Sequence, residues 1–525
     1  MQISKIIDEL VLRDAIHTLD CGRRGIEKEG LRYTSSDRLA QTPHPRSLGS
    51  PLTHPEITTD YAESMLELVT PAFRNRRDTL THLRFLHRVL AADNEGYILN
   101  GSMPAYIADT EAVAIGRYGD SNQGKMRTLY RKGLALRYGK AMQLISGMHF
   151  NYSLCLDVFR NYAEILGQIF SQPFIDKSYM NLVRNIRIHA WLISYLFGHS
   201  PAVDSSFFNG RPHALDTLDE STLYLPYATS LRMSDIGYHN KTPVIVCANT
   251  LGQYIGDLQK AVFAPSVQYE ALGLRDNDGH LQQISTNIMQ IENEYYSVAR
   301  PKQISGEGET TLAGLARRGI AYVELRALDI NCFDWAGISQ RQLDFLELFM
   351  LFCLFRPAPE LDAAMDGVCT VNGARVAARG RDPQLRLDNF GRHQRIAEWG
   401  KQILEAMIPI AEAMDREKHR PHYLSIVERM LELIRDPELT PSARILRYLR
   451  GEEGGAPMTY HRFITDLSRK HMEKSRRVGI TPAERAKVTA DAKASWQKAK
   501  MLDEASRGVD FEQYLKEYFA TIRAV

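Results

Sequence analysis

The sequence predicts an α+β fold, with strands concentrated in the first two thirds of the chain and helices in the last third. Several segments before residue 335 alternate polar and apolar residues with the period of two that strands show. Beyond residue 338 apolar residues recur at three- and four-residue steps, and no strand pattern of comparable quality follows. We therefore expect a sheet-and-helix core over 1–335 and a helical region over 336–525, packed together as one structural unit.

The composition is that of a folded globular protein. Hydrophobic residues make up 44% of the 525 residues and charged residues 24%, so a substantial core is expected. The net charge of +2 gives no overall field that would attract nucleic acid or anionic lipid. The locally basic stretch 461–500 spreads its charges over amphipathic helices, which favours a solvated helix face over nucleic-acid binding.

No targeting or membrane segment is expected from the sequence. Residues 1–10 lack the uninterrupted apolar region of a secretory signal. The longest apolar run, 346–355, contains Glu347 and is about half of the roughly 20 residues that a membrane span needs. Six cysteines without Cys-x-x-Cys spacing argue against both a zinc site and a disulfide framework. A cytoplasmic protein with no membrane partner is the expectation.

The expected elements follow from these patterns in chain order. Ile6, Ile7 and Leu10 recur at helical spacing, whereas the proline-rich passage 35–55 can be neither regular helix nor central strand. Expected strands cover 24–32, the second half of 58–71, 147–154, 282–296 as one strand or a pair of strands, and 321–331. Expected helices cover 3–18, 78–92, 126–134, 180–196, 338–355, 392–415, 423–435, 440–449 and several segments from residue 460 onward.

The strands present charged faces. In 24–32 the alternation places Glu27 and Glu29 on the same face, and 58–71 carries Asp60 and Glu67 near apolar neighbours. Carboxylates side by side repel each other unless a cation lies between them. The next strands add a histidine, an acid and an arginine, namely His149, Glu324 and Arg326.

These charged strand faces have two possible interpretations. A solvated face explains any one strand, but several such faces in one chain favour a sheet whose polar side lines a cavity. Oxygen-rich ligands from separate strands suit Mg²⁺, and converging arginines suit phosphoryl-group chemistry. No phosphate-binding loop or kinase motif is present, so a nucleotide site would have another architecture. The cations of 126–134 are either a solvated helix face or an anion-binding surface.

Eight ordered segments resemble the proteobacterial glutamate–cysteine ligase family. They extend over nearly the whole chain, and together they are far more specific than any single motif. These segments are 24–29 (RGIEKE), 58–63 (TTDYAE), 128–131 (TLYR), 145–151 (ISGMHFN), 228–235 (ATSLRMSD), 291–296 (IENEYY), 323–331 (VELRALDIN) and 439–447 (LTPSARILR).

The resemblance implies a fold and a reaction. The fold is related to glutamine synthetase: a curved, largely antiparallel sheet that forms an active-site funnel covered by helices. The reaction is the ATP-dependent joining of the L-glutamate γ-carboxylate to the L-cysteine amine through a γ-glutamyl phosphate, the first step of glutathione synthesis. We also expect a monomer, and glutathione as a feedback inhibitor.

The resemblance further implies roles for individual residues. Arg326 is expected to contact the transferred phosphoryl group and Arg232 to hold the glutamate α-carboxylate, so both are candidate catalytic residues. The expected Mg²⁺ ligands, with Mn²⁺ as an alternative ion, are Glu27, Glu29, Asp60, Glu67, His149 and Glu324. Expected nucleotide-binding residues are Arg131, Arg300 and Lys302. The expected cysteine pocket comprises Tyr61, Tyr130, Leu134, Gln143, Tyr238 and Tyr296.

Tyr61 is the departure from the family that bears most directly on function. It stands where phenylalanine is expected, which places a hydroxyl in or near the thiol pocket and leaves the choice of amine open. A γ-glutamyl ligase for another amine is therefore one alternative function. A catalytically silent nucleotide- or glutathione-binding sensor is another, although no member of the acidic set is missing.

Overall fold

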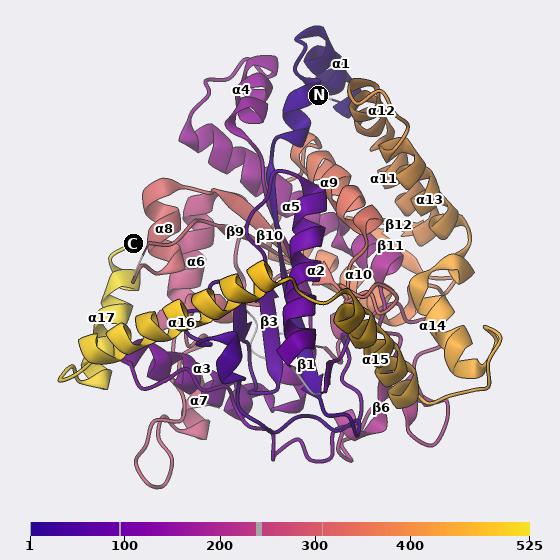
Figure 1. Ribbon diagram of the computed structural model, residues 1–525. Coiled ribbons are helices and arrows are strands. Elements are labelled where there is room, and N and C mark those ends of the chain that lie inside the picture. The colour runs from indigo at the N-terminus through magenta and orange to yellow at the C-terminus, as the bar shows by residue number, and fades with distance from the viewer. Residues whose placement is uncertain (1, 94–95, 238–243, 307) are drawn as a thin grey trace.

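A seven-stranded antiparallel sheet lies at the centre of the computed structural model, which describes residues 2–93, 96–237, 244–306 and 308–525 (Figure 1). The strand order is β2-β3-β1-β5-β10-β9, and β4 pairs with β1 at the side of this path. The strands are β1 (Arg23–Tyr33), β2 (Ile57–Thr59), β3 (Met65–Val69), β4 (Tyr97–Ile98), β5 (Met148–Ser153), β9 (Ala299–Lys302) and β10 (Tyr322–Leu328). The α+β class and the largely antiparallel sheet are thus confirmed.

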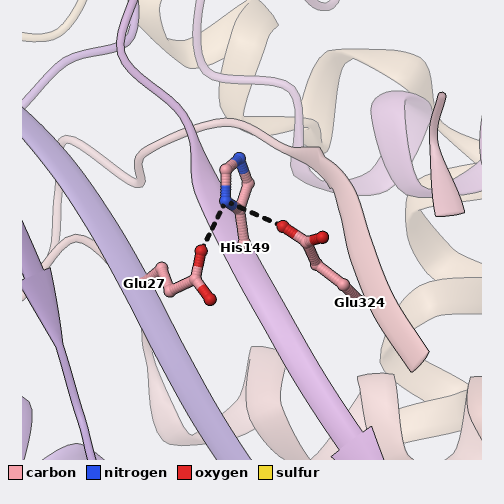
Figure 2. Close-up of side chains that lie close together, drawn as sticks. All are labelled: Glu27, His149 and Glu324. Atoms are coloured by element: carbon pink, nitrogen blue, oxygen red, sulfur yellow. Dashed lines mark hydrogen bonds and ion pairs between the residues drawn. The ribbon is translucent and has the colours of Figure 1, made fainter. Parts of the chain in front are cut away.

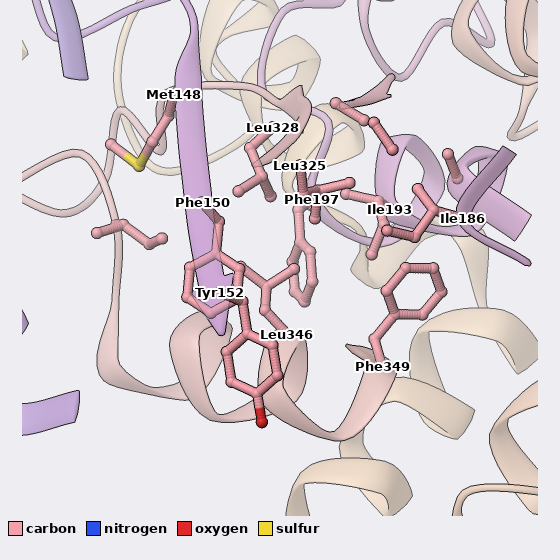
Figure 3. Close-up of a cluster of buried hydrophobic side chains, with 14 of the residues drawn as sticks. Met148, Phe150, Tyr152, Ile186, Ile193, Phe197, Leu325, Leu328, Leu346 and Phe349 are labelled. Atoms are coloured by element: carbon pink, nitrogen blue, oxygen red, sulfur yellow. The ribbon is translucent and has the colours of Figure 1, made fainter. Parts of the chain in front are cut away.

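One face of this sheet is apolar and packs on two long helices, α5 (Gln172–Phe197) and α9 (Gln340–Phe355). Figure 3 shows Phe150 and Leu325 of the sheet beside Ile193 of α5 and Leu346 of α9. The alternation of β5 explains this arrangement, because Phe150 is turned away from its neighbour His149. The opposite face of the sheet is therefore free to carry polar groups.

Before residue 380 the described part of the chain contains eight further helices. Leu83 and Leu86 of α2 are buried, and Ser121 caps the N-terminus of α3 by accepting a hydrogen bond from the Gly124 amide. These helices are α1 (Ile3–Leu12), α2 (Arg76–Asp93), α3 (Asn122–Tyr138), α4 (Leu156–Ile165), α6 (Leu251–Phe263), α7 (Val267–Leu272), α8 (Thr311–Arg318) and α10 (Ala363–Arg379).

The last part of the chain is mostly helical, as predicted. Its helices are α11 (Ile396–Glu405), α12 (Ile408–Glu417), α13 (Tyr423–Arg435), α14 (Pro441–Arg450), α15 (Tyr460–Val478), α16 (Pro482–Ala505) and α17 (Phe511–Arg523). Tyr423 of α13 donates a hydrogen bond to Glu347 of α9 over 3.1 Å, and Arg24 of β1 pairs with the same carboxylate. These buried contacts connect the C-terminal helices to the sheet, although the division at residue 335 stays a prediction.

Three predicted elements are wrong. The helix predicted over 3–18 ends at Leu12, because Asp14 adopts a left-handed conformation with φ of 54°. Residues 282–296 form no strand and contain only a short 3₁₀ turn, Glu292–Glu294. The predicted helix over 392–415 starts later, at Ile396, because residues 392–395 belong to a hairpin.

That hairpin also overturns the expectation of no strands after residue 338. β11 (Arg386–Asn389) pairs with β12 (Arg392–Arg395), and the turn between them has Phe390 and Gly391 at positive φ. Short polar strands of four residues carry too little alternation to be recognised in a helical region. A second small sheet contains β6 (Ala202–Asp204), β8 (Thr222–Tyr224) and β7 (Asp216–Thr217).

The cysteines give another correction. Cys21 and Cys155 form a disulfide, although their spacing suggested no disulfide pairing. Arg23 pairs with Ser153 at the end of the β1–β5 ladder, and the two cysteines lie just beyond this pair. Strand pairing brings together residues that are 134 positions apart in sequence, so spacing alone could not reveal them. Among the described residues, no helix is both long and apolar enough to cross a membrane.

Candidate active site

The strand register gathers the predicted acidic residues on the polar face of the sheet. Glu27 of β1 lies opposite His149 of β5, and Glu29 of β1 lies opposite Glu67 of β3. Glu324 of β10 pairs across the next ladder with Asn151 of β5, which lies two residues from His149 on the same face. The predicted side-chain faces are confirmed by this register.

The centre of the site is formed by Glu27, His149 and Glu324, drawn in Figure 2. His149 Nδ1 lies 3.0 Å from Glu27 Oε2 and 3.3 Å from Glu324 Oε1, so both carboxylates point at one ring nitrogen. Asn151 donates a further hydrogen bond to Glu27 over 2.8 Å. Burial alone would raise the pKa of Glu27, but the hydrogen bond with His149 holds that pKa below its usual value. Glu27 is therefore ionised at neutral pH.

Three more carboxylates surround this centre. Asp60 follows β2, Glu29 lies on β1 and Glu67 lies on β3. Burial and then the nearby charges of Glu27, Asp60 and Glu29 raise the pKa of Glu67 well above its usual value. Burial, followed by the charge of Glu29, also raises the pKa of Asp60. Such mutual repulsion is relieved when a cation binds between the carboxylates.

Basic residues lie at the β9–β10 edge of the same face. Lys302 Nζ is 3.2 Å from Glu324 Oε2, and Arg326 Nη1 is 2.5 Å from Glu324 Oε1. Burial would raise the pKa of Glu324, but Arg326 and Lys302 take it well below its usual value. Arg300 lies opposite Glu324 in the β9–β10 ladder and is also buried. The face thus combines an acidic centre with a cationic edge.

Arg232 reaches the site from a short 3₁₀ helix, Leu231–Met233. Ser230 caps this helix and donates to Asp329 over 2.8 Å, which fixes the segment. The Arg232 guanidinium donates to the Arg326 carbonyl over 3.0 Å. A Cβ atom at Gly147 would lie 2.3 Å from Arg232 Nη2, so the guanidinium position requires glycine there. Only a residue without a side chain permits this approach.

A cavity of about 1240 Å³ opens over this face. Within the described part of the chain, every predicted site residue lines the cavity, including the nucleotide candidate Arg131 and the pocket candidates Tyr61, Tyr130, Leu134, Gln143 and Tyr296. The Arg131 guanidinium donates to the Asp60 carbonyl and packs over the Tyr118 ring at 4.4 Å. Tyr238 lies outside the described residues.

The C-terminal helices form part of the cavity wall, which was not predicted from the sequence. Leu502 of α16 and Tyr514 and Tyr518 of α17 line it. The Tyr518 hydroxyl donates to Glu292 over 2.7 Å, and the other oxygen of Glu292 accepts from the Thr311 amide over 3.1 Å. Amphipathic patterning identified α16 and α17 as helices, but an apolar stripe does not reveal whether it faces a core or a cavity.

The donor set fits Mg²⁺. One imidazole and five carboxylates from four strands and one connecting segment supply mainly oxygen ligands, which Mg²⁺ and Mn²⁺ prefer. One oxygen or nitrogen from each of Glu27, His149 and Glu324 lies within 4.8 Å of the others, close enough to share an ion. The adjacent Arg326 and Lys302 suit an anionic ligand that binds the same ion.

The chain is similar to known proteins over almost its whole length. The sequence profile of the glutamate–cysteine ligase family matches residues 7–376. The glutamate–cysteine ligase of Azotobacter vinelandii is 41% identical over 523 residues, which cover 98% of this chain and 96% of that protein. The enzyme of the same name from Pseudomonas aeruginosa strain LESB58 is 42% identical over 502 residues, covering 95% and 94% of the two chains.

Solved structures agree with these sequence matches. The crystal structure of a Francisella tularensis glutamate–cysteine ligase in complex with AMP has a TM-score of 0.89 and 32% identity, and the match covers 96% of this chain and 98% of that one. A bifunctional glutathione synthetase from Pasteurella multocida shares the fold, with a TM-score of 0.69, 24% identity, and coverage of 89% and 55%. From its sequence, its sheet and its relatives, this chain belongs to the glutamate–cysteine ligase family.

Proposed function

We propose that this protein uses ATP to join the γ-carboxylate of L-glutamate to the amine of L-cysteine, the first step of glutathione synthesis. The observation that carries the proposal is the convergence of Glu27, His149 and Glu324 with Arg326 and Lys302 on one sheet face inside a large cavity. This combination of an acidic cation site and a cationic edge suits phosphoryl transfer to a carboxylate.

The reaction proceeds in two steps. An oxygen of the glutamate γ-carboxylate attacks the terminal phosphorus of ATP, and ADP leaves. The amine nitrogen of the acceptor then attacks the γ-carbonyl carbon of the acyl phosphate, so that a C–N bond forms, the C–O bond to phosphate breaks and the amine loses a proton. Both steps depend on positioning and charge neutralisation, because a free carboxylate is a poor electrophile.

Magnesium bound by Glu27, Glu29, Asp60, Glu67, His149 and Glu324 would neutralise the phosphate oxygens of ATP. The protein supplies the remaining positive charge through Arg326, which neutralises the phosphoryl group during transfer, and through Arg300 and Lys302 beside it. His149 holds the Glu27 carboxylate in place through its Nδ1 contact. Arg131, at the other side of the acidic centre, is proposed as a further nucleotide-binding residue.

Glutamate and the acceptor occupy separate parts of the cavity in this proposal. Arg232 binds the glutamate α-carboxylate, because its guanidinium is held beside Gly147 and the Arg326 carbonyl. The acceptor lies against helix α3, where Tyr130 and Leu134 are four residues apart and face the same way. The pocket is completed by Tyr61, Gln143 and Tyr296, with Tyr238 as a proposed member outside the described residues.

The proposal also includes the location, oligomeric state and inhibition of the protein. We expect a cytoplasmic monomer that glutathione inhibits by feedback. A γ-glutamyl ligase for another amine is the alternative that the Tyr61 hydroxyl favours, because this buried group is a polar feature of the acceptor pocket. A silent sensor is disfavoured by the complete acidic set.

The test measures ADP release with glutamate, ATP and Mg²⁺, comparing cysteine with a panel of other small amines, and identifies the product by mass. Cysteine is expected to stimulate ADP release most strongly and to yield γ-glutamylcysteine. A stronger response to a different amine would support the alternative ligase. No stimulation by any amine would exclude ligase activity.

A further inference from the structure

Helix α17 is docked beside the active-site cavity by a small apolar cluster. Leu515 of α17 is buried in this cluster together with Met126 of α3 and with Ile291. Among the described residues the cluster is distinct from the main core of the protein. Ile291 directly precedes the 3₁₀ helix Glu292–Glu294, which lines the cavity. The apolar cluster therefore holds α17 next to a segment of the cavity wall.

Hydrogen bonds connect α17 to the edge of the cavity through one carboxylate. Tyr518 donates its hydroxyl hydrogen to Glu292 Oε2 over 2.7 Å. Glu292 is 5% exposed, and its Oε1 accepts from the Thr311 amide over 3.1 Å. One oxygen is thus bonded to α17 and the other to the first residue of α8. Because a buried charged acceptor is costly to leave without a donor, these two bonds fix the carboxylate in one position.

The residues next to Glu292 hold Arg300, which is a proposed nucleotide-binding residue. The Arg300 guanidinium donates to the Asn293 carbonyl over 3.1 Å and to the Tyr295 carbonyl. Arg300, Asn293 and Thr311 all line the cavity. The position of this short segment therefore determines where the charge of Arg300 lies and how the adjoining cavity edge is placed.

We propose that Tyr518 is a positioning residue for ATP, which acts through Glu292 on the nucleotide-binding residue Arg300. This inference rests on the proposed ligase function and makes helix α17 part of its nucleotide site. Tyr518 and Glu292 are 226 positions apart, so α17 must be docked before that site is complete. Arg232, the proposed glutamate ligand, is held instead by the Arg326 carbonyl and the capped 3₁₀ helix 231–233. Loss of the Tyr518 hydroxyl should therefore weaken ATP binding and leave glutamate binding unchanged.

The experiment compares the wild-type protein with Tyr518→Phe, Glu292→Leu and Glu292→Gln. Initial rates give KM for ATP and for glutamate, and isothermal titration with MgADP gives a Kd that does not depend on turnover. Tyr518→Phe removes one hydroxyl and keeps the ring in its apolar surroundings. This variant should raise KM for ATP and Kd for ADP at least fivefold, whereas KM for glutamate should change less than twofold.

Two comparisons distinguish positioning from direct contact with the nucleotide. In Glu292→Gln the carboxamide oxygen can accept from the Thr311 amide and the carboxamide nitrogen can donate to Tyr518. This variant should therefore bind ADP at least threefold more tightly than Glu292→Leu. Because Tyr518 acts through Glu292, adding Tyr518→Phe to Glu292→Leu should change the Kd for ADP less than twofold. Additive losses would show that Tyr518 contacts the nucleotide itself, and would overturn the positioning role.

Glu512→Ala is the matched control. Glu512 lies on the same helix and pairs with Arg275 over 2.7 Å, but both side chains are exposed and neither lines the cavity. An exposed ion pair contributes little to stability, so this variant should keep the wild-type KM for ATP. Thermal unfolding of every variant verifies that the protein is folded.

A KM for ATP within twofold of wild type in Tyr518→Phe would overturn the inference and leave the ligase function intact. An equal rise in KM for glutamate would also overturn it, because the variant would then have loosened the whole cavity. Absence of amine-dependent ADP release in wild type would instead contradict the proposed function, and the ADP titrations would still decide the role of Tyr518.

Discussion

Glu29 of β1 lies directly opposite Glu67 of β3 in the antiparallel register of the central sheet. Two like charges at opposed positions destabilise a sheet, and burial increases that cost. Burial and the surrounding carboxylates raise the pKa of Glu67 well above its usual value. A cation bound between the two carboxylates would relieve this repulsion.

Replacing Glu67 tests this relationship through stability. A raised carboxylate pKa means that the folded state binds more protons than the unfolded state, so stability falls as pH rises above 4.5 toward the raised pKa. In EDTA at pH 8, Glu67→Gln should be more stable than wild type by about 1 kcal/mol or more, since one pKa unit corresponds to about 1.4 kcal/mol. Urea unfolding measures the difference.

Added Mg²⁺ provides the matching control for Glu67→Gln. It should raise the thermal midpoint of wild type more than that of the variant, because binding to the folded state stabilises it. Binding of a cation between these carboxylates predicts both results. A variant less stable than wild type in EDTA, or an equal response of both proteins to Mg²⁺, would contradict it.

Gly147 is predicted to control glutamate binding. A Cβ atom in Gly147→Ala would lie 2.3 Å from Arg232 Nη2 and displace the guanidinium. The KM for glutamate should rise at least tenfold, about 1.4 kcal/mol of binding, whereas the KM for ATP should change less than threefold. Initial-rate kinetics give both constants.

Gly373→Ala is the control for this substitution, because a Cβ atom there meets nothing within 4 Å and the position lies inside α10. Its kinetics should match those of wild type. If Gly147→Ala left the glutamate KM unchanged, the assignment of Arg232 to the glutamate carboxylate would be wrong.

His189 is predicted to make the fold sensitive to acid. Burial, with the nearby charge of Arg356, lowers the pKa of His189 to about 3, so the side chain stays neutral in the fold. The unfolded chain binds a proton as pH falls below 6.5, and the folded chain does not, so stability is lost from pH 6.5 downward. Between pH 6.5 and pH 5 this loss is about 2 kcal/mol.

The variant His189→Gln lacks this proton linkage. From pH 6.5 to pH 5, the free energy of unfolding of wild type should therefore fall by about 2 kcal/mol more than that of the variant. Urea unfolding at each pH measures both values. His280→Gln, in an exposed loop, should leave the pH profile unchanged. If the free energy of unfolding of wild type and of His189→Gln fell equally as the pH was lowered, His189 would not be the source of acid sensitivity.

The sequence predicted the side-chain faces of the central strands better than it predicted the bounds of the local elements around them. Alternation in β1, β5 and β10 assigned Glu27, His149 and Glu324 to the correct faces, because a strand has a strict period of two. Periodicity does not show that these strands are neighbours, because strand pairing joins residues far apart in the chain. The family resemblance supplied that information.

Other structural features could not be predicted from any short stretch of the sequence. The disulfide between Cys21 and Cys155 depends on the β1–β5 pairing, and the cavity wall formed by Tyr514 and Tyr518 depends on how α17 packs. The hydrogen bond between Tyr518 and Glu292 depends on the same packing, because the two residues are 226 positions apart in the chain. The hairpin at 386–395 was missed because its strands are short and polar.

The central claim is that the sheet face around Glu27, His149 and Glu324 activates the glutamate γ-carboxylate as an acyl phosphate. Glutamate labelled with ¹⁸O in the γ-carboxylate tests this claim most directly. With ATP, Mg²⁺ and cysteine, the released phosphate should carry one ¹⁸O atom from each glutamate consumed, detected by mass spectrometry. Release of phosphate without ¹⁸O while γ-glutamylcysteine forms would contradict the account.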